Sequence, residues 1–123
     1  MAAPRPIRSQ SYEQVYELVR TAILNKQPIA AVYRERRRLF CPYVLGRNRE
    51  GRINALCYQF GGGSASGLKE FGSTDNWRCV EVEKLTSVEL LSTGWINPPN
   101  YSRHQSCIET IEAEVERHET AGI

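Results

Sequence analysis

The apolar residues of this chain change their spacing at Pro28, and that change constrains the fold more than any other feature. From residue 29 to residue 91, apolar and polar residues alternate in short runs, which is typical of β-strands. Before the proline, the apolar residues recur at the spacing of one helix face, and they are Val15, Leu18, Val19, Ala22 and Ile23. Because proline has no amide hydrogen and its ring clashes with a preceding helical turn, this helix must end close to Lys26. The sequence predicts a helix over residues 11–26, followed by a mainly β region.

Short strands separated by turn residues are expected after the proline. The predicted strands cover residues 29–34, 39–45, 53–60, 77–83 and 88–91. The connections are a tight turn at 35–37, a hairpin loop at 46–51, a long flexible Gly- and Ser-rich loop at 61–76 and a corner at 84–87. Pro42 lies inside the second strand, so that strand is expected at a sheet edge or with a bulge.

A last segment, residues 102–119, has the pattern of a second helix. Ser106 and Glu109 fit a capping box, and Ile108, Ile111 and Val115 form a narrow apolar stripe. A helix, five short strands with a corner before the last, and a helix suit a small SH3- or Sm-like barrel over residues 29–92. Residues 1–10 are expected to form a flexible tail, and residues 11–123 a single domain.

The composition is that of an ordinary globular protein, with 41% apolar and 24% charged residues. No apolar run reaches about 18 residues, and the N-terminus lacks a signal-peptide pattern, so we expect a cytoplasmic protein with no membrane span. The cysteines form no CxxC pair, so we expect no metal site and buried, free thiols in a reducing compartment. They are Cys41, Cys57, Cys79 and Cys107.

Charge is distributed unevenly along the chain. Residues 34–52 hold seven arginines against two glutamates, a net charge of +5, and residues 34–38 alone hold four of these arginines. Residues 109–119 hold one arginine against five glutamates, a net charge of −4. A basic face suits an anionic ligand. The alternative is that the acidic tail neutralises the basic face within the molecule.

Several short motifs occur in the order and spacing found in the WYL domain of bacterial regulators. They are Tyr33, Arg38-x-x-x-Pro42, Leu45, a hairpin, a strand ending in Tyr58, and Arg78-x-Val80-Glu81-Val82-Glu83-Lys84-Leu85. The chain resembles that family over about residues 18–92. In the family, a strand with Tyr leads to an Arg-x-x-x-Pro strand, and a later strand reads Arg-x-Phe-Arg-Leu-Asp-Arg-Ile. The chain departs from the family at residues 53–55, where the Trp-Tyr-Leu triplet is absent, and at Glu81 and Lys84, which replace arginines.

The resemblance implies an Sm-like barrel whose basic pocket binds a nucleotide or a short single-stranded nucleic acid, in control of transcription or of phage defence. The ligand-binding residues would be Arg38, Arg78 and Lys84, with Tyr33 and Tyr58 shaping the pocket. Arginine suits this role because its planar guanidinium grips phosphate with two parallel hydrogen bonds. With 28 residues before the first strand, there is no room for a helix-turn-helix, so we expect a stand-alone module.

Two further interpretations remain open. Arg34, Arg36 and Arg37 extend the basic face, so the chain would instead bind RNA or single-stranded DNA without sequence preference, with steep salt dependence. Alternatively, the chain is an assembly subunit that docks a protein partner or a second copy of itself. We find no pattern of catalytic residues and expect neither an enzyme nor a cofactor.

Overall fold

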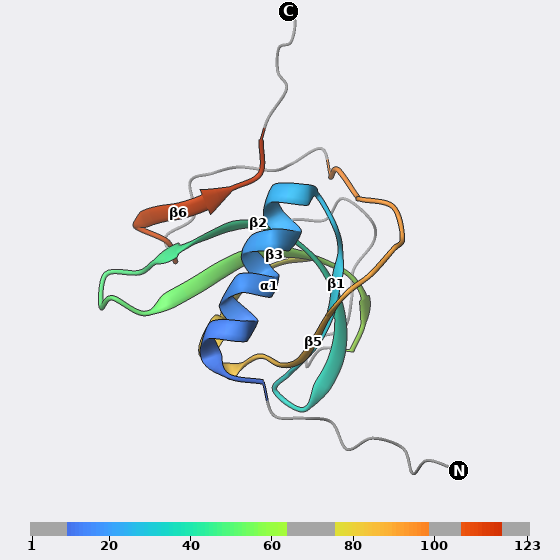
Figure 1. The fold of residues 1–123 in the computed structure, drawn as a ribbon, viewed down its shortest axis with the longest axis horizontal. Coiled ribbons are helices and arrows are strands. Elements are labelled where there is room, and N and C mark those ends of the chain that lie inside the picture. Colours follow the sequence, from blue (N-terminus) through green and yellow to red (C-terminus); the bar gives the residue numbers. More distant parts are fainter. Residues whose placement is uncertain (1–9, 64–75, 99–106, 117–123) are drawn as a thin grey trace, which may run out of the picture.

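The computed structural model describes residues 10–63, 76–98 and 107–116 (Figure 1). Within these ranges the chain forms one α-helix, α1 (Tyr12–Asn25), and a six-stranded antiparallel sheet. The strands are β1 (Ile29–Tyr33), β2 (Arg36–Arg47), β3 (Ile53–Gly62), β4 (Trp77–Glu81), β5 (Thr86–Leu90) and β6 (Thr110–Glu114), and the 3-10 turn η2 (Val82–Lys84) follows β4. The predicted tail at 1–10 and most of the predicted loop at 61–76 lie outside the described residues.

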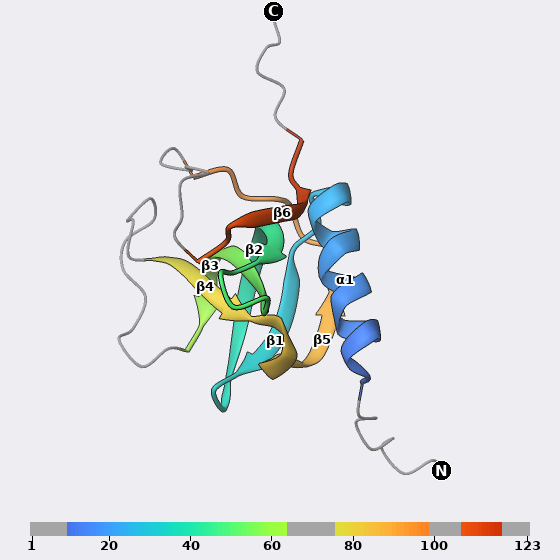
Figure 2. The same ribbon diagram turned by 90° about the vertical axis from the view of Figure 1, so that its left-hand side faces the viewer.

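The N-terminal helix is confirmed, and local chemistry sets both of its ends. The Ser11 hydroxyl accepts a hydrogen bond from the Gln14 amide, and the Gln14 side chain accepts one from the Ser11 amide. Lys26 ends the helix in the left-handed region with φ 51°, just before Pro28. The buried face of the helix packs on β2, β5, β6 and η2, so α1 covers one side of the sheet (Figure 2).

The strand β2 is the long central element of the sheet. Neighbouring strands follow the order β4-β3-β2-β1-β5, and β6 pairs with β2 off this path. The first part of β2 pairs with β1 through Phe40, and the last part pairs with β6 from Val44 onward. Pro42 lies between these two parts, at a register shift toward β3, so the bulge is the one of the two predicted alternatives that is confirmed.

The predicted closed barrel is not found, because the sheet is open. Among the described residues, β4 pairs with β3 and β5 pairs with β1, and no hydrogen-bonded ladder joins β4 to β5. The turn η2 redirects the chain between these two outer strands, so that they end the sheet on opposite sides. The fold is therefore a mainly β, six-stranded open sheet with one helix.

The prediction of a second helix is wrong for the described part of that segment. Residues 110–114 form β6, which pairs with β2. The amides of Glu109 and Val115 extend this pairing at both ends, because they donate to the carbonyl groups of Arg47 and Tyr43, respectively. Ala113 and Val115, two positions apart, are both buried, and the register shift between Leu45 and Gly46 places Ile111, which is 45% exposed, on the other face. The edge of β2 that β1 leaves uncovered therefore decides the conformation of this segment. The rest of the predicted helix lies outside the described residues.

The first hairpin also differs from the prediction. Its turn residues are Arg34 and Glu35, which both have positive φ angles of 52° and 67°, and Tyr33 pairs with Arg36 across the turn. This geometry is that of a two-residue hairpin turn, which usually contains Gly or Asn. The consequence is that Arg36 and Arg37 belong to β2, so the basic stretch continues directly into the sheet.

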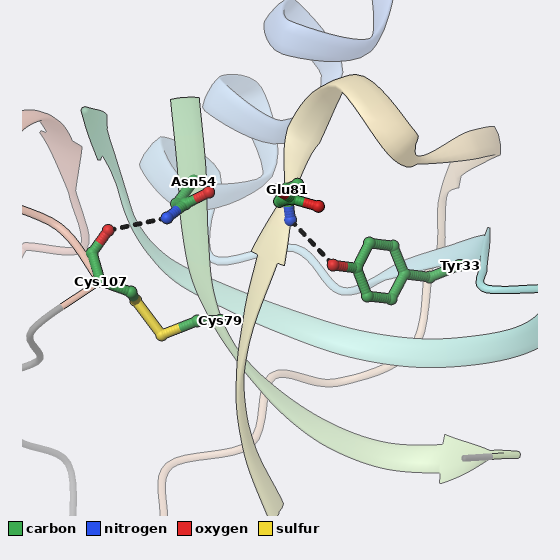
Figure 3. Close-up of a disulfide and its surroundings, with 5 residues drawn as sticks. All are labelled: Tyr33, Asn54, Cys79, Glu81 and Cys107. Atoms are coloured by element: carbon green, nitrogen blue, oxygen red, sulfur yellow. Dashed lines mark hydrogen bonds between the residues drawn. A yellow bond between two sulfur atoms is a disulfide. The ribbon is translucent and has the colours of Figure 1, made fainter. Parts of the chain in front are cut away.

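The expectation of four free thiols is wrong for one pair of cysteines. Cys79 on β4 and Cys107, just before β6, form a disulfide that joins residues 28 positions apart (Figure 3). Cys41 and Cys57 are free and buried, as expected. In the described part of the chain, no helix has the length and apolar character needed to cross a membrane.

Candidate anion-binding site

The register of the sheet gathers polar side chains on one face of β2, β3 and β4. Cross-strand partners project to the same face, and so do residues two apart on one strand. Phe40 pairs with Gln59, and Cys57 pairs with Arg78. Arg38 therefore shares a face with Gln59 and Arg78. The strands β2 and β4 lie about 10 Å apart on either side of β3, a span that two arginine side chains can bridge.

Arg38 is the unusual residue of this face, because it is a charged side chain with only 5% of its surface exposed. Its Nε donates a hydrogen bond of 3.1 Å to the Tyr33 carbonyl oxygen. Its guanidinium carbon lies 5.3 Å from the centre of the Tyr33 ring, a cation–π contact. Among the described residues, no carboxylate forms an ion pair with Arg38.

Three other arginines act on the charge of Arg38. Burial is the first cause that lowers the pKa of Arg38, and the positive charge of Arg78 is the second. Tyr33 raises this pKa, and Arg36 and Arg34 lower it further. A buried cation among other cations is unfavourable unless an anion joins it, because burial removes the water that would otherwise stabilise the charge. The site is therefore electrostatically prepared for an anionic group.

Gln59 contacts Arg78 on this face, and it was not among the residues predicted from the sequence. It is fully buried, and its Oε1 accepts a hydrogen bond of 3.2 Å from Arg78 Nε. Its Nε2 donates to the carbonyl oxygens of Gly61 and Gly63 at 2.9 and 3.0 Å. Gln59 thus ties the orientation of Arg78 to the end of β3. The signal that could have identified it is a polar glutamine inside an otherwise apolar central strand.

The two predicted tyrosines lie on different faces. Tyr33 is 5% exposed, and its hydroxyl accepts a hydrogen bond of 3.1 Å from the Glu81 amide, which ties the end of β1 to β4 (Figure 3). Tyr58 precedes Gln59 and therefore projects to the opposite face, where its ring packs edge-on against Trp77. Tyr33 thus forms a wall of the site, and Tyr58 belongs to the packing behind it.

The remaining predicted residues surround the site at the surface. Lys84 forms an ion pair of 3.1 Å with Glu81, so its charge is already partnered. The Arg34 guanidinium lies 5.3 Å from the centre of the Tyr33 ring, the same distance as that of Arg38. Arg36 and Arg37 are exposed at the start of β2. These three arginines extend the positive charge outward from Arg38.

Comparisons with known proteins give a fold and no family. No protein-family model matches the chain, and no curated protein matches it. The chain is similar to a solved structure, the Proteasome accessory factor B/C (PafBC) of Arthrobacter aurescens, a protein that contains a WYL domain. The identity is 22% and the TM-score is 0.55, and the match covers 84% of this chain but 15% of PafBC. This likeness shows a shared fold.

Proposed function

We propose that this chain is a WYL-like ligand-sensing module that binds a phosphate-bearing ligand, a nucleotide or a short single-stranded nucleic acid, at Arg38 and Arg78. One observation supports this proposal above the others. Arg38 is buried, the positive charges of Arg78, Arg36 and Arg34 lower its pKa, and the described residues form no ion pair with it. A phosphate would supply the missing negative charge and accept hydrogen bonds from both guanidinium groups.

The chemistry of the site favours phosphate over a simple monovalent anion. Two guanidinium groups on opposite sides of β3 offer two planar sets of donors, and a phosphate has enough acceptor oxygens to use both. Gln59 holds Arg78 from the side, so little side-chain freedom is lost when a ligand binds. The outer arginines Arg34, Arg36 and Arg37 would follow further phosphates along a strand.

The biological role in this proposal is regulation by a change in association with a partner protein, in transcription or phage defence. The shared fold with a WYL-domain protein supports it. The chain would act as a binding module and not as an enzyme. The proposal leaves Lys84 out of the primary site, because Glu81 already holds it.

Fluorescence anisotropy tests the proposal directly. Labelled single-stranded DNA and RNA oligomers are titrated at two salt concentrations, with mono- and dinucleotides as competitors. Saturable binding that a small nucleotide displaces is the expected result. The double variant R38A/R78A should lose binding while it retains the circular dichroism spectrum of the native protein. Arg47→Ala, which removes an arginine at the other end of β2, is the matched control. Undiminished binding in the double variant contradicts the proposal.

A second candidate function is an assembly subunit, and exposed apolar side chains favour it. Tyr12, Leu24 and Ile111 are 41%, 52% and 45% exposed. Such residues are common singly on protein surfaces, so this observation is weaker than the buried arginine. Light scattering over a range of protein concentrations is the test. A mass that rises with concentration supports assembly with a second copy, and a constant monomer mass counts against self-assembly.

A further inference from the structure

The disulfide between Cys79 and Cys107 joins β4 to the segment that leads into β6. Cys79 lies on β4, immediately after Arg78, and Cys107 lies three positions before the start of β6. In the sheet, β4 pairs with β3 and β6 pairs with β2. The segment before β6 therefore lies beside β3 and β4, and the bond closes a loop between residues 28 positions apart in sequence (Figure 3).

The two strands nearest the disulfide, β4 and β6, are both short. Each has five residues, and each pairs with one neighbouring strand among the described residues. Strands at the edge of a sheet open more easily than central strands, because they have fewer hydrogen bonds and contacts to lose. The disulfide limits such opening for both strands together, and β4 is the strand that carries Arg78.

The disulfide is accessible from solvent. Cys79 is exposed, and Cys107 lines a cleft of about 630 Å³. The other lining residues are Asn48, Arg49, Glu50, Asn54, Ile108 and Glu109. One arginine and two carboxylates thus line the same cleft as Cys107, which complements a small molecule that carries both carboxylate and ammonium groups.

A buried amide marks the floor of this cleft. Asn54 is 6% exposed, and its Nδ2 donates a hydrogen bond of 2.8 Å to the Cys107 carbonyl oxygen (Figure 3). Its Oδ1 is buried and has no hydrogen-bond partner among the described residues. The amide thus holds the backbone of Cys107 against β3.

The other two cysteines are unsuited to exchange. Cys41 and Cys57 are buried within the sheet. Burial raises the pKa of Cys41 to about 11 and also raises the pKa of Cys57. The thiolate is the reactive form of cysteine, so neither residue attacks a disulfide at neutral pH. Redox chemistry is therefore confined to the Cys79–Cys107 pair.

We propose that Cys79–Cys107 is a thiol–disulfide exchange site, reduced by low-molecular-weight thiols that carry carboxylate and ammonium groups, and that its state controls Arg78. The thiolate of one reductant molecule in the cleft attacks the sulfur of Cys107, and the sulfur of Cys79 leaves and takes up a proton. The thiolate of a second reductant molecule then attacks the sulfur of the first, and the sulfur of Cys107 leaves and takes up a proton. The protein gains two thiols, and the two reductant molecules become one small disulfide.

Reduction should loosen β4 and thereby the anion site. Arg78 precedes Cys79 on the same strand, and the contact from Arg78 Nε to Gln59 depends on the position of β4. With the disulfide open, β4 and β6 lose their common tether and open independently. Arg78 is then oriented less of the time, and the affinity for an anion falls. This consequence rests on the proposed function, whereas the exchange chemistry does not.

The exchange site is tested on the whole chain in buffers of reduced and oxidised glutathione, with alkylation and peptide mass mapping. We expect Cys79 and Cys107 to gain label together while Cys41 and Cys57 stay unlabelled until the protein is unfolded. Hydrogen exchange of amides in β4 and β6 should accelerate at least about tenfold on reduction. The double variant C79S/C107S is the control and should show fast exchange in both buffers. Labelling of all four cysteines together, or unchanged exchange in β4 and β6, overturns the proposal.

A binding measurement separates the two proposals. The labelled single-stranded oligomer is titrated into the oxidised and reduced forms, and we expect at least about fivefold weaker binding to the reduced form. Equal binding to both forms overturns the control of Arg78. If neither form binds while labelling and hydrogen exchange behave as expected, the proposed function fails and the exchange site stands.

Discussion

The two ends of β2 carry arginines that differ in their burial and in their ion pairs. At the end that pairs with β6, the Nε of Arg47 lies 2.7 Å from a carboxylate oxygen of Glu112, and the Tyr16 hydroxyl donates to the other oxygen at 2.7 Å. At the end that pairs with β1, Arg38 is buried, and the charges of three other arginines lower its pKa. Within the described ranges, the same strand thus carries one arginine that is paired with a carboxylate and one that is not.

This difference decides between two interpretations of the charge pattern. The acidic segment could have neutralised the whole basic stretch, and at Arg47 it does so through Glu112. The described part of this segment does not pair with the Arg38 end, because β6 pairs with β2 from Val44 onward and β1 occupies the earlier part. Topology therefore separates an arginine that is paired with a carboxylate from one that forms no ion pair among the described residues.

The largest effect expected from this comparison comes from two glycines, Gly62 on β3 opposite Arg38 and Gly46 beside Arg47 on β2. Gly62 has φ 81°, and a Cβ there would overlap the Arg37 carbonyl oxygen, whereas a Cβ at Gly46 would overlap the Thr110 carbonyl oxygen. Gly62→Ala should destabilise the protein by about 3 kcal/mol, from the clash and the positive φ together. Urea denaturation followed by circular dichroism measures the loss.

The matched change Gly46→Ala separates stability from binding. It should displace β6 and lower stability by about 2 kcal/mol, because β6 must move away from β2. It should nevertheless leave oligomer binding within about twofold, since it lies at the Arg47 end, whereas Gly62→Ala distorts the backbone of Arg37 and Arg38. Loss of binding in Gly46→Ala alone would show that the two ends are not independent.

Single arginine replacements test whether the two ends of β2 contribute differently to oligomer binding. Arg38→Ala should weaken binding of a labelled oligomer by about 30-fold, or about 2 kcal/mol, because a charge-assisted pair to phosphate is lost. Arg47→Ala should change binding by less than about twofold, since its charge is already partnered by Glu112. Equal losses of affinity in the two variants would mean that oligomer binding depends on the net charge of the protein and not on a specific site. Anisotropy at two salt concentrations distinguishes these cases.

The sequence predicted the elements whose signals are local. The helix was predicted to within about a residue at each end, because Ser11, Gln14 and Pro28 act on their own neighbours. The five strands before residue 92 were predicted from alternation, with small errors at their ends. The common face of Arg38 and Arg78 follows from pairing both strands with β3, and this convergence was expected.

The features that the sequence did not predict depend on distant partners. The strand β6 has apolar residues at 108, 111 and 115, a spacing that also fits a helix, and only the open edge of β2 selects a strand. The disulfide joins residues that are brought together by the sheet, so spacing gave no sign of it. Sheet closure failed as a prediction because the path of the chain through η2 depends on tertiary packing.

Inorganic phosphate should stabilise the protein through the Arg38 end of β2. A ligand that binds the folded state at ten times its Kd adds about 1.4 kcal/mol to the free energy of unfolding. We therefore expect the urea midpoint to rise with phosphate at constant ionic strength, and R38A/R78A to show no such rise. Chloride at the same ionic strength is the control. A rise of equal size in the double variant would place phosphate elsewhere on the molecule.

The smallest effect expected is a pH-dependent change in the free energy of unfolding, and it arises at the Arg47 end of β2. The hydrogen bond from Tyr16 is the first cause that lowers the pKa of Glu112, and the contact with Arg47 lowers it further. The folded state therefore binds this proton less readily than the unfolded state, so the stabilisation is present above pH 4.5 and is lost as the pH falls further. Glu112→Gln should cost about 0.5–1 kcal/mol at pH 7 and nothing at low pH. Glu17→Gln, at an exposed position on α1, is the control.

The same hydrogen bond should act in the opposite direction at high pH. It is the first cause that raises the pKa of Tyr16 from 10.0 to about 12. The unfolded state loses this proton first, so the stabilisation is complete below pH 10 and is lost as the pH approaches 12. Tyr16→Phe should abolish this loss while leaving the Arg47 contact, and combining it with Glu112→Gln should add little because both remove one bond. Full additivity in urea denaturation would show that Glu112 acts through Arg47 alone, and the two ends of β2 would then differ by a single ion pair.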